Sequence, residues 1–394
     1  MDTNTRSMWN YRIGRVMGIP IRLNVSLLVF VPLLAWLLGR PEQIAIYASL
    51  IEWLSGAEVD VATLTTGNTP IVVGLAGAIG LFASVLLHEL GHSWVARRYD
   101  IPIGSITLWI FGGVAAMERI PKEPIREFWI AIAGPAVSVA LGLGAYLLLL
   151  VVPEIPLVVF LVGWLAVINV MLALFNMLPA FPMDGGRIFR ALLARNRPYV
   201  DATRTASRVG RWFAVGLGVL GFLGFNPILI LLALFLYAAA SSESRAVVLE
   251  DLLTGITAGD LADTDMLTVE TTVNVQDLLS RMLAERRTGY PVVDGRGSIV
   301  GLVDLSDLRG VPEGERGAVR TRDVMNEDVR TVPAETPAFE VLRLLSETGV
   351  DRIVVEEMGT PLGVVSEAEF ARALTVLRGI GRRPESPEWV AGVR

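Results

Sequence analysis

Apolar stretches long enough to cross a lipid bilayer dominate the first 240 residues, and no other feature of the sequence constrains the fold as strongly. A helix rises about 1.5 Å per residue, so roughly 20 apolar residues are needed to cross a hydrocarbon core of about 30 Å. Six stretches come close to that length: residues 23–38, 71–96, 129–152, 155–178, 209–225 and a shorter one, 227–240. The sequence therefore predicts a polytopic α-helical membrane protein with about six transmembrane helices, inserted in the lipid bilayer.

Two further segments beside these stretches have the composition of strands. Residues 11–22 and 101–117 are rich in glycine and β-branched residues and are too apolar for free loops. Non-helical backbone at membrane depth is tolerated only where it packs on protein or lines a wet cavity. We therefore expect membrane-associated β-strands and an enclosed cavity.

Arginine and lysine alternate between the loops. They are frequent before the first stretch, between the second and third, and after the fourth, whereas the loop of residues 41–70 carries acids (Glu42, Glu52, Glu58, Asp60). Basic residues in short loops mark the cytoplasmic side. The pattern predicts a multi-pass protein of the cell membrane, with its N-terminus and its polar C-terminal region in the cytoplasm.

Charge and cysteine content exclude several functions. The net charge is -6, and no extended basic cluster is present, so we expect no nucleic-acid partner. Cysteine is absent, which excludes thiol nucleophiles and cysteine-based metal sites. A metal in this protein must be held by His, Asp or Glu.

The two histidines of the chain form one motif. It reads His88-Glu89-Leu90-Gly91-His92, an HExxH pattern inside the second apolar stretch. Positions i and i+4 share one helix face, so both imidazoles can bind one divalent ion while Glu89 acts as general base toward a water. Polar groups of this kind are costly in a membrane without a function, which favours a metal site over a packing feature.

A catalytic zinc site needs three protein ligands, and here the third must be a carboxylate. Asp184 is the acid with the best context, because it follows an apolar run with prolines at 179 and 182 and precedes Gly185 and Gly186. The prolines end the fourth helix and leave an extended stretch that can present the carboxylate. Asp184 can also serve as the cap of the helix that follows it, and the two roles are compatible.

Together these motifs resemble the site-2 protease family of intramembrane zinc metalloproteases (peptidase family M50), in the prokaryotic branch with cytoplasmic CBS domains. The resemblance rests on HExxH in the second stretch and on N-x-x-P-x-x-P-x-D-G-G, residues 176–186, after the fourth. It implies that His88, His92 and Asp184 bind one zinc ion and that Glu89 activates the water. It also implies that Asn176 positions the substrate or stabilises the oxyanion, and that the strand around Gly112 and Gly113 pairs with an unwound transmembrane substrate.

The polar region repeats itself with a period of about 62 residues and resembles a tandem pair of CBS domains. Each copy reads as strand, helix, two strands and helix, a soluble α/β module. Such pairs in many proteins bind ATP or AMP through a G-h-h-[ST]-x-x-D motif. Both copies here depart from it: the first has Asp304 in the place of the hydroxyl and ends on Asp307, and the second has Ser366 but Glu369 in the place of the aspartate. Asp307 and Ser366 are the nucleotide contacts that the resemblance implies, and homodimerisation through the CBS pair is an equal alternative.

The predicted division is a membrane metalloprotease domain (1–245), a linker (246–257), a first CBS domain (258–311), a second CBS domain (319–378) and a loose tail (379–394). The predicted function is hydrolysis of peptide bonds within the transmembrane helices of other proteins. Two alternatives stay open: a CBS-gated channel or transporter, and a catalytically idle metal-binding scaffold. The intact HExxH and Asp184 set argues against the channel, and the presence of Glu89 argues against the scaffold.

Overall fold

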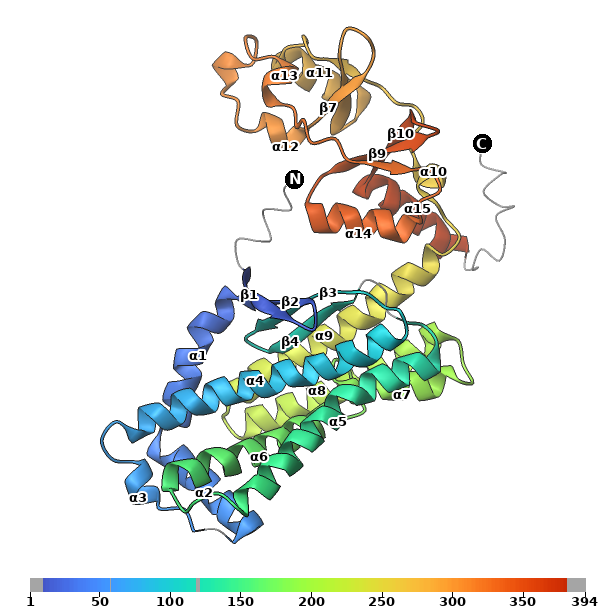
Figure 1. Cartoon of the computed structure of the whole chain (residues 1–394). Coiled ribbons are helices and arrows are strands. Elements are labelled where there is room, and N and C mark those ends of the chain that lie inside the picture. Colours follow the sequence, from blue (N-terminus) through green and yellow to red (C-terminus); the bar gives the residue numbers. More distant parts are fainter. Residues whose placement is uncertain (1–9, 57, 118–120, 381–394) are drawn as a thin grey trace. The chain divides into compact units, whose positions relative to one another are not determined.

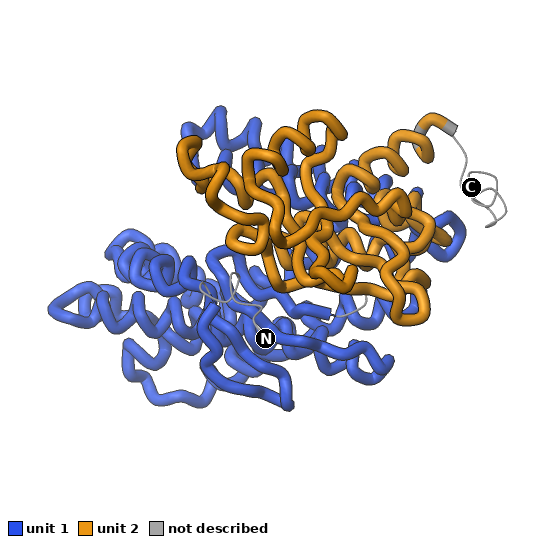
Figure 2. The backbone as a smooth tube through the Cα atoms, turned by 90° about the horizontal axis from the view of Figure 1, so that it is seen from above, with its two compact units in different colours: residues 1–247 blue, residues 248–394 orange. Residues whose placement is uncertain are grey.

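The chain separates into two compact units. The computed structural model describes residues 10–56, 58–117 and 121–380. The first unit comprises residues 1–247 and the second residues 248–394 (Figure 2). Each unit has its own hydrophobic clusters, so each is treated below as a separate body.

The first unit is helical, and prolines start most of its long helices. Pro41, Pro70, Pro124 and Pro156 occupy the first turns of their helices, where a missing N–H costs no hydrogen bond. The helices are α1 (Val25–Leu38), α2 (Pro41–Ser55), α3 (Val61–Leu64), α4 (Thr69–Arg98), α5 (Pro124–Leu149), α6 (Pro156–Asn176), α7 (Asp184–Ala194), α8 (Tyr199–Leu223) and α9 (Pro227–Leu252). Helices α4, α5 and α6 contact one another and form the centre of the unit (Figure 1).

Four described helices are long and apolar enough to cross a membrane, namely α4, α5, α6 and α9. The pair α1 and α2 passes the same test together but bends by 72°, which gives five spans if the pair counts as one. This number differs from the six expected. The expected span at residues 209–225 lies in α8, whose first half carries Asp201, Arg204 and Arg208, and α2 falls where a loop was expected.

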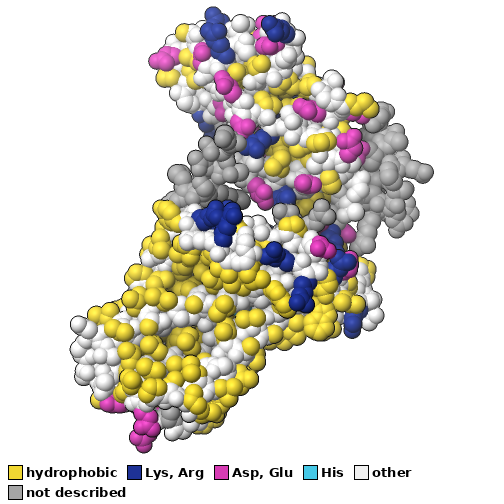
Figure 3. Space-filling model, viewed as in Figure 1, with side chains coloured by type: hydrophobic (Ala, Val, Ile, Leu, Met, Phe, Trp, Pro, Cys, Tyr) yellow, Lys and Arg dark blue, Asp and Glu magenta, His cyan; other side chains and the backbone are white. Residues whose placement is uncertain are grey.

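The outside of the first unit is apolar. Hydrophobic side chains cover the face shown in Figure 3, with basic side chains near one end of the unit and acidic side chains at the opposite end. On α4, the exposed Ile71, Leu75 and Ile79 follow each other at four-residue spacing. His88 and His92 are buried on the inner side of the same helix. The helix therefore separates a lipid-facing surface from a polar interior.

The expected strands form a four-stranded sheet in the order β1-β2-β3-β4. Strand β1 (Asn10–Val16) pairs antiparallel with β2 (Ile19–Asn24), β2 pairs parallel with β3 (Ile103–Trp109), and β3 pairs antiparallel with β4 (Gly112–Met117). Ile19, Ile21 and Ile106 of the sheet pack with Leu90 of α4 in one buried cluster. The sheet thus covers the segment of α4 that carries the HExxH motif, and β4 is an edge strand.

The second unit contains two copies of one α/β motif, which confirms the predicted tandem α/β fold. In the first copy, β5 (Val269–Glu270), β6 (Gly289–Val293) and β7 (Ile299–Asp304) form a sheet with α11 (Val275–Glu285). In the second copy the equivalents are β8 (Thr331–Pro333), β9 (Arg352–Glu357), β10 (Thr360–Ser366) and α14 (Ala338–Thr348). The remaining elements are α10 (Ala258–Leu261), α12 (Leu305–Leu308), the 3-10 turn Glu313–Glu315, α13 (Thr321–Val324) and α15 (Glu367–Ile380).

The segment that precedes each copy packs on the other copy. Ile256 and Ala258 belong to the core that surrounds α14, and Val319 and Val324 contact the core that surrounds α11. An isolated bridge pairs Asp263 with Val364 of β10. The two copies therefore form one body. Helix α15 extends to residue 380, and most of the predicted loose tail, residues 381–394, lies outside the described residues.

Candidate metal centre

Three side chains from two distant parts of the sequence converge inside the first unit. His88 Nε2 lies 3.0 Å from Asp184 Oδ2, His92 Nε2 lies 3.1 Å from the same oxygen, and the two Nε2 atoms are 3.1 Å apart. All three residues are buried, with exposed fractions of 3 to 7%. Helix α4 supplies both histidines, and the first residue of α7 supplies the carboxylate.

Helix α5 orients both imidazoles through their other nitrogens. His92 Nδ1 lies 2.7 Å from the carbonyl oxygen of Ile130, and His88 Nδ1 lies 2.9 Å from the hydroxyl of Ser138. A carbonyl oxygen only accepts, so His92 Nδ1 carries a proton, and the Nε2 lone pair of the neutral ring points inward. Metal-binding histidines characteristically donate their second N–H in this way.

The inward-facing atoms fit a metal ion. A proton bridges two atoms at most, whereas these three acceptor atoms all face one another. A divalent cation satisfies all three atoms at once. Ligands at zinc distances of about 2.0–2.1 Å in a tetrahedron are about 3.3 Å apart, close to the observed separations. His88, His92 and Asp184 also form a compact group of metal-ligating side chains.

Glycine 134 leaves the space that this arrangement needs. A Cβ at Gly134 of α5 would overlap the Nε2 atoms of both histidines. Gly91 lets α4 and α5 approach closely, because its Cβ would lie 2.9 Å from the carbonyl oxygen of Ala133. The small residues on both helices therefore position the rings.

Glu89 lies beside the three converging side chains and against the sheet. It is half-buried, and a Cβ at Gly113 of β4 would lie 2.5 Å from its Cγ and 3.2 Å from its Oε1. The carboxylate thus stands between the HExxH helix and the edge strand. A general base in this place is next to both a metal ion and a peptide strand paired with β4.

The segment between α6 and α7 presents Asp184 as the proline pattern predicts. Helix α6 ends at Asn176, and Met183 is the N-cap of α7, with no capping hydrogen bond from its side chain. The Asp184 carboxylate contacts the histidines. Gly185 packs on the carbonyl oxygens of Met177 and Leu178, where a Cβ would overlap both. The close approach expected of the glycine pair is therefore present.

The hydrogen bond that the Asn176 side chain makes within the described residues is not to the three converging side chains. The Asn176 amide donates to the carbonyl oxygen of Leu172, one turn back in α6, at 3.0 Å. A buried asparagine of the same helix, Asn169, donates to the Ser84 hydroxyl of α4 at 2.9 Å. Asn169 was not predicted from the sequence, because a single amide in an apolar stretch forms no motif.

Three residues of a buried ion network close to the metal ligands also form no recognisable sequence motif. Arg190 of α7 is 1% exposed and binds Glu127 of α5, which is 3% exposed, and Glu243 of α9. The only sequence signal is the presence of charged residues next to apolar stretches. In the sequence, the basic residues of this region indicate only the cytoplasmic side.

The motif positions of the second unit are engaged in internal contacts. Asp307 Oδ2 accepts from the backbone N–H of Asp304 at 2.8 Å. The Ser366 hydroxyl donates to Glu369, which also accepts the Ser366 backbone N–H at 2.8 Å. Asp307 and Ser366 thus have separate partners, one set in each copy. The Asp304 carboxylate, in the place of the motif hydroxyl, accepts from Arg352 Nε at 2.8 Å.

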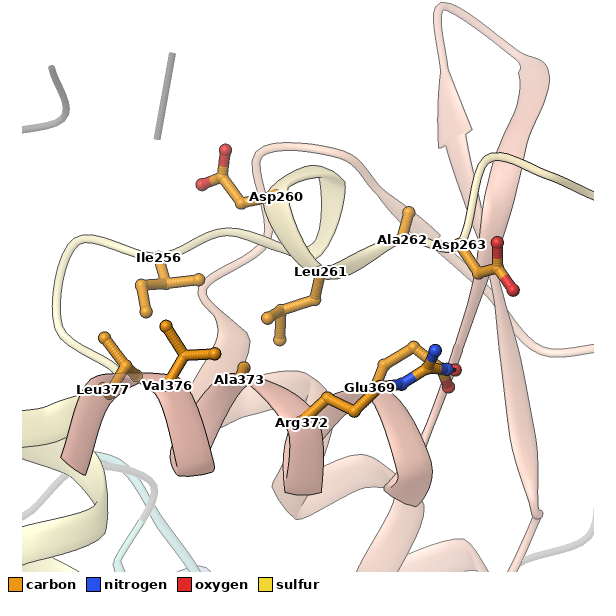
Figure 4. A pocket seen from close by; sticks show the side chains of 10 residues that line it. All are labelled: Ile256, Asp260, Leu261, Ala262, Asp263, Glu369, Arg372, Ala373, Val376 and Leu377. Atoms are coloured by element: carbon orange, nitrogen blue, oxygen red, sulfur yellow. Dashed lines mark hydrogen bonds and ion pairs between the residues drawn. The ribbon is translucent and has the colours of Figure 1, made fainter. Parts of the chain in front are cut away.

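A cavity of about 350 Å³ lies beside Glu369 in the second unit (Figure 4). Apolar side chains of α15 and of the segment before the first copy line it, among them Leu261, Val376 and Leu377. Glu369 and Arg372 form an ion pair at one end. The cavity therefore combines an apolar wall with a charged end.

Comparison with known proteins matches both units. A family model described as Peptidase family M50 matches residues 76–158 and 154–217, and one described as CBS domain matches residues 258–314 and 322–376. The zinc metalloprotease MJ0392 of Methanocaldococcus jannaschii is 35% identical over 377 residues, which are 94% of this chain and 97% of the relative.

Two solved structures align with parts of the chain. The site-2 protease from Methanocaldococcus jannaschii is 35% identical and covers 60% of this chain and 96% of its own, with a TM-score of 0.41. CBSX2 in complex with AMP is 25% identical and covers 32% of this chain and 99% of its own, with a TM-score of 0.29.

Proposed function

The chain belongs to peptidase family M50, the site-2 protease family, and from this premise we propose that His88, His92 and Asp184 hold one zinc ion and that Glu89 is the general base. The protein is a zinc metalloprotease of the intramembrane type with C-terminal CBS domains. The observation that supports the residue assignment is the convergence of three buried acceptor atoms within 3.1 Å of one another.

The chemistry divides between the metal and the chain. Zinc, when bound, polarises the scissile carbonyl and lowers the pKa of the attacking water toward about 7. Glu89 takes the proton from that water and delivers it to the leaving nitrogen. The Ile130 carbonyl holds His92 in the tautomer that leaves Nε2 free, and the Ser138 hydroxyl orients the ring of His88. Asn176 is kept as a candidate for positioning the substrate, since its amide would have to leave the Leu172 carbonyl to act.

The substrate is a membrane-spanning protein segment that must unwind before it is cut. A transmembrane helix hides its peptide bonds in internal hydrogen bonds, so cleavage requires an extended conformation. Strand β4 is the edge of the four-stranded sheet, and its Gly113 lies against Glu89. An unwound segment that pairs with β4 by β-addition would pass the general base.

The loop charges support the orientation. Basic residues gather near one end of the first unit and acidic residues at the other (Figure 3). By the positive-inside rule the basic end faces the cytoplasm. An even number of spans, such as the six expected or the four single helices that qualify, places the N-terminus and the CBS domains on that side. The chain is thus a multi-pass protein of the cell membrane.

Cleavage of a model single-span substrate by the full chain in detergent tests the assignment. Glu89→Gln and a chelated sample are run in parallel. We expect a fragment cut within the span from the wild type alone, and one zinc per chain in both the wild type and Glu89→Gln. Bound zinc without a fragment in any lane would favour the idle scaffold, and absence of both would favour the channel.

For the CBS pair we propose a regulatory role, with an adenine nucleotide as the ligand class. The cavity beside Glu369 supports this, because its apolar wall suits an adenine ring and its charged end suits polar groups (Figure 4). Ser366 and Glu369 are bonded to each other, so a ribose would have to exchange with that internal pair. In the first copy, Asp307 occupies the motif position that Glu369 occupies in the second.

Calorimetric titration of the full chain with ATP and AMP tests this role. We expect binding that is lost in Glu369→Ala, with the same titration of Glu340→Ala, an acid of α14 outside the cavity, unchanged. No heat of binding together with a concentration-dependent dimer would support the alternative, a CBS pair that associates two chains.

A further inference from the structure

The Arg190 network joins α5 and α7, two helices of the metal centre, to α9. Arg190 Nε donates to Glu127 Oε1 at 2.7 Å, Nη2 lies 2.5 Å from the same oxygen, and Nη1 lies 2.7 Å from Glu243 Oε1. All three guanidinium nitrogens are therefore engaged by carboxylates. Charge-assisted contacts of this forked kind fix direction as well as distance.

Aromatic rings complete the enclosure of the guanidinium. Its central carbon lies 4.8 Å from the Phe181 ring and 4.9 Å from the Tyr199 ring. Phe181 belongs to the segment that leads into Asp184, and Tyr199 begins α8. One side chain thus contacts residues of α5, α8, α9 and the segment before α7, as well as standing on α7 itself.

Two members of the network are close in sequence to groups of the metal centre. Arg190 is six residues after Asp184 on α7. Glu127 is three residues before Ile130, whose carbonyl oxygen accepts from His92. Helix α5 orients the imidazoles of α4, so the position of α7 relative to α5 affects how far Asp184 lies from them. The Arg190–Glu127 pair joins α5 and α7 directly.

A gain in folding stability does not by itself explain why Arg190, Glu127 and Glu243 are buried together. A buried ion pair often contributes no more than an apolar replacement of similar volume, because both charges lose their hydration. Here two carboxylates share one guanidinium, and Glu127 Oε2 has no hydrogen-bond partner among the described residues. The contacts instead determine one relative arrangement of the helices.

We propose that Arg190 is a positioning residue for the metal centre, which holds Asp184 at ligand distance from His88 and His92 by locking α7 to α5 and α9. The inference rests on the proposed zinc site. Lysine at this position keeps the charge but has one ammonium group, which cannot reproduce the fork. We therefore expect Arg190→Lys to fold and to bind metal less tightly.

Metal affinity of the full chain in detergent, measured by competition with a chromogenic chelator, tests the proposal. Arg190→Lys is expected to bind zinc about 10- to 100-fold more weakly, the usual effect of losing an outer-shell partner. The absorption spectrum of the cobalt-substituted protein should change as well, because it reports ligand geometry. Arg204→Lys is the matched control, since Arg204 forms an exposed pair with Asp201 on α8.

The outcomes separate the positioning role from a structural one. Wild-type affinity and an unchanged cobalt spectrum in a folded Arg190→Lys would overturn the proposal, even with a lowered melting temperature. If Arg190→Lys shows no cooperative unfolding, Glu243→Gln decides, because that side chain is 27% exposed and the change is milder. A smaller loss of affinity in Glu243→Gln supports the proposal and wild-type affinity overturns it. A wild-type chain that binds no zinc would instead remove the metal site itself.

Discussion

The two units treat the polar groups at their motif positions in opposite ways. In the first unit, His88, His92 and Asp184 point their acceptor atoms at one another and leave a charge that only a cation satisfies. In the second unit, the polar groups at the motif positions bind neighbours in the same body, as Ser366 binds Glu369 and Asp304 binds Arg352. The first arrangement is prepared for a ligand, and the second is complete without one.

This difference shows that a motif identifies candidate groups but not whether they are free. The HExxH and G-h-h-[ST]-x-x-D patterns are both recognisable in sequence. Only the partners of each side chain distinguish a site that needs a metal from one whose polar groups already have hydrogen bonds. Substitutions in the two units should therefore have different consequences: loss of a ligand in the first, and loss of internal pairing in the second.

The largest effect is expected from Asp184→Asn. The amide keeps the volume of the carboxylate but removes the anionic ligand, so zinc should be lost and proteolysis should fall to the uncatalysed background. Metal content and cleavage of a single-span substrate measure both. Asp201→Asn on α8, an exposed acid, is the control. A full complement of zinc in Asp184→Asn would contradict the ligand assignment.

Glu89→Gln separates the base from the ligands. Loss of a general base reduces rates by about 10²- to 10⁴-fold, and zinc content should stay at one per chain because Glu89 is not among the converging ligand atoms. The measurement is the cleavage rate at saturating substrate alongside metal analysis. Equal loss of zinc and activity would mean that Glu89 holds the metal rather than the proton.

In the second unit, Arg352→Met should destabilise the fold without touching the metal. Arg352 and Asp304 are 10% and 13% exposed, and burial raises the Asp304 pKa although Arg352 lowers it. Removing one partner of a buried pair costs about 3–5 kcal/mol. Calorimetric unfolding of the full chain should show the loss.

The control for that change is Arg343→Met, which removes an exposed pair with Glu347 on α14 and should cost about 1 kcal/mol or less. Zinc content should be unchanged in both variants. A melting temperature for Arg352→Met equal to that of Arg343→Met would show that the motif positions of the first copy are not held by internal pairing.

The sequence predicted the parts of the site that have a period or a chemical requirement. Four-residue spacing puts His88 and His92 on one helix face, and the need for a third anionic ligand indicated Asp184. Ser138, Gly134 and Arg190 were not predicted. Each is a single residue in its helix, and its role depends on which helices meet, which spacing along one chain does not show.

The same distinction applies to the fold, where features with a local period are predictable and features that depend on contacts between helices are not. The strands, the CBS repeat and the four longest apolar helices follow from local periodicity and length. The bend of 72° between α1 and α2 depends on how these helices pack, whereas α8 is not a candidate span because its first half is charged. The sequence therefore predicts about six spans, and four described helices and one bent helix pair meet the length and composition expected of a span.

A smaller effect is expected from Gly134→Ala, which tests the space beside the imidazoles. The new Cβ would overlap both Nε2 atoms, so the rings must shift at a cost of about 1–3 kcal/mol, and zinc affinity should fall. Gly144→Ala on the same helix meets nothing within 4 Å and should stabilise the helix slightly. Equal zinc affinities of the two variants would show that α5 does not constrain the rings.

The smallest effect is expected from Tyr290→Phe, which removes a satisfied polar group of the second unit. The buried phenol donates to Glu285 Oε2 at 2.7 Å, and burial together with this bond raises the Tyr290 pKa to about 12. Because the unfolded value is about 10, the folded state favours the neutral phenol. That stabilisation is complete below pH about 10 and is lost as the pH rises through about 12.

Tyr290→Phe should therefore abolish this alkaline loss of stability, while at neutral pH it costs only the net free energy of one hydrogen bond, about 1 kcal/mol. Spectrophotometric titration of the tyrosines, compared between wild type and variant, isolates the Tyr290 phenol. Calorimetric unfolding across the same pH range measures its contribution to stability. A Tyr290 phenol that titrates near the unfolded value would mean that this group is not held by Glu285, and the contrast between a completed second unit and a ligand-ready first unit would be weaker at that position.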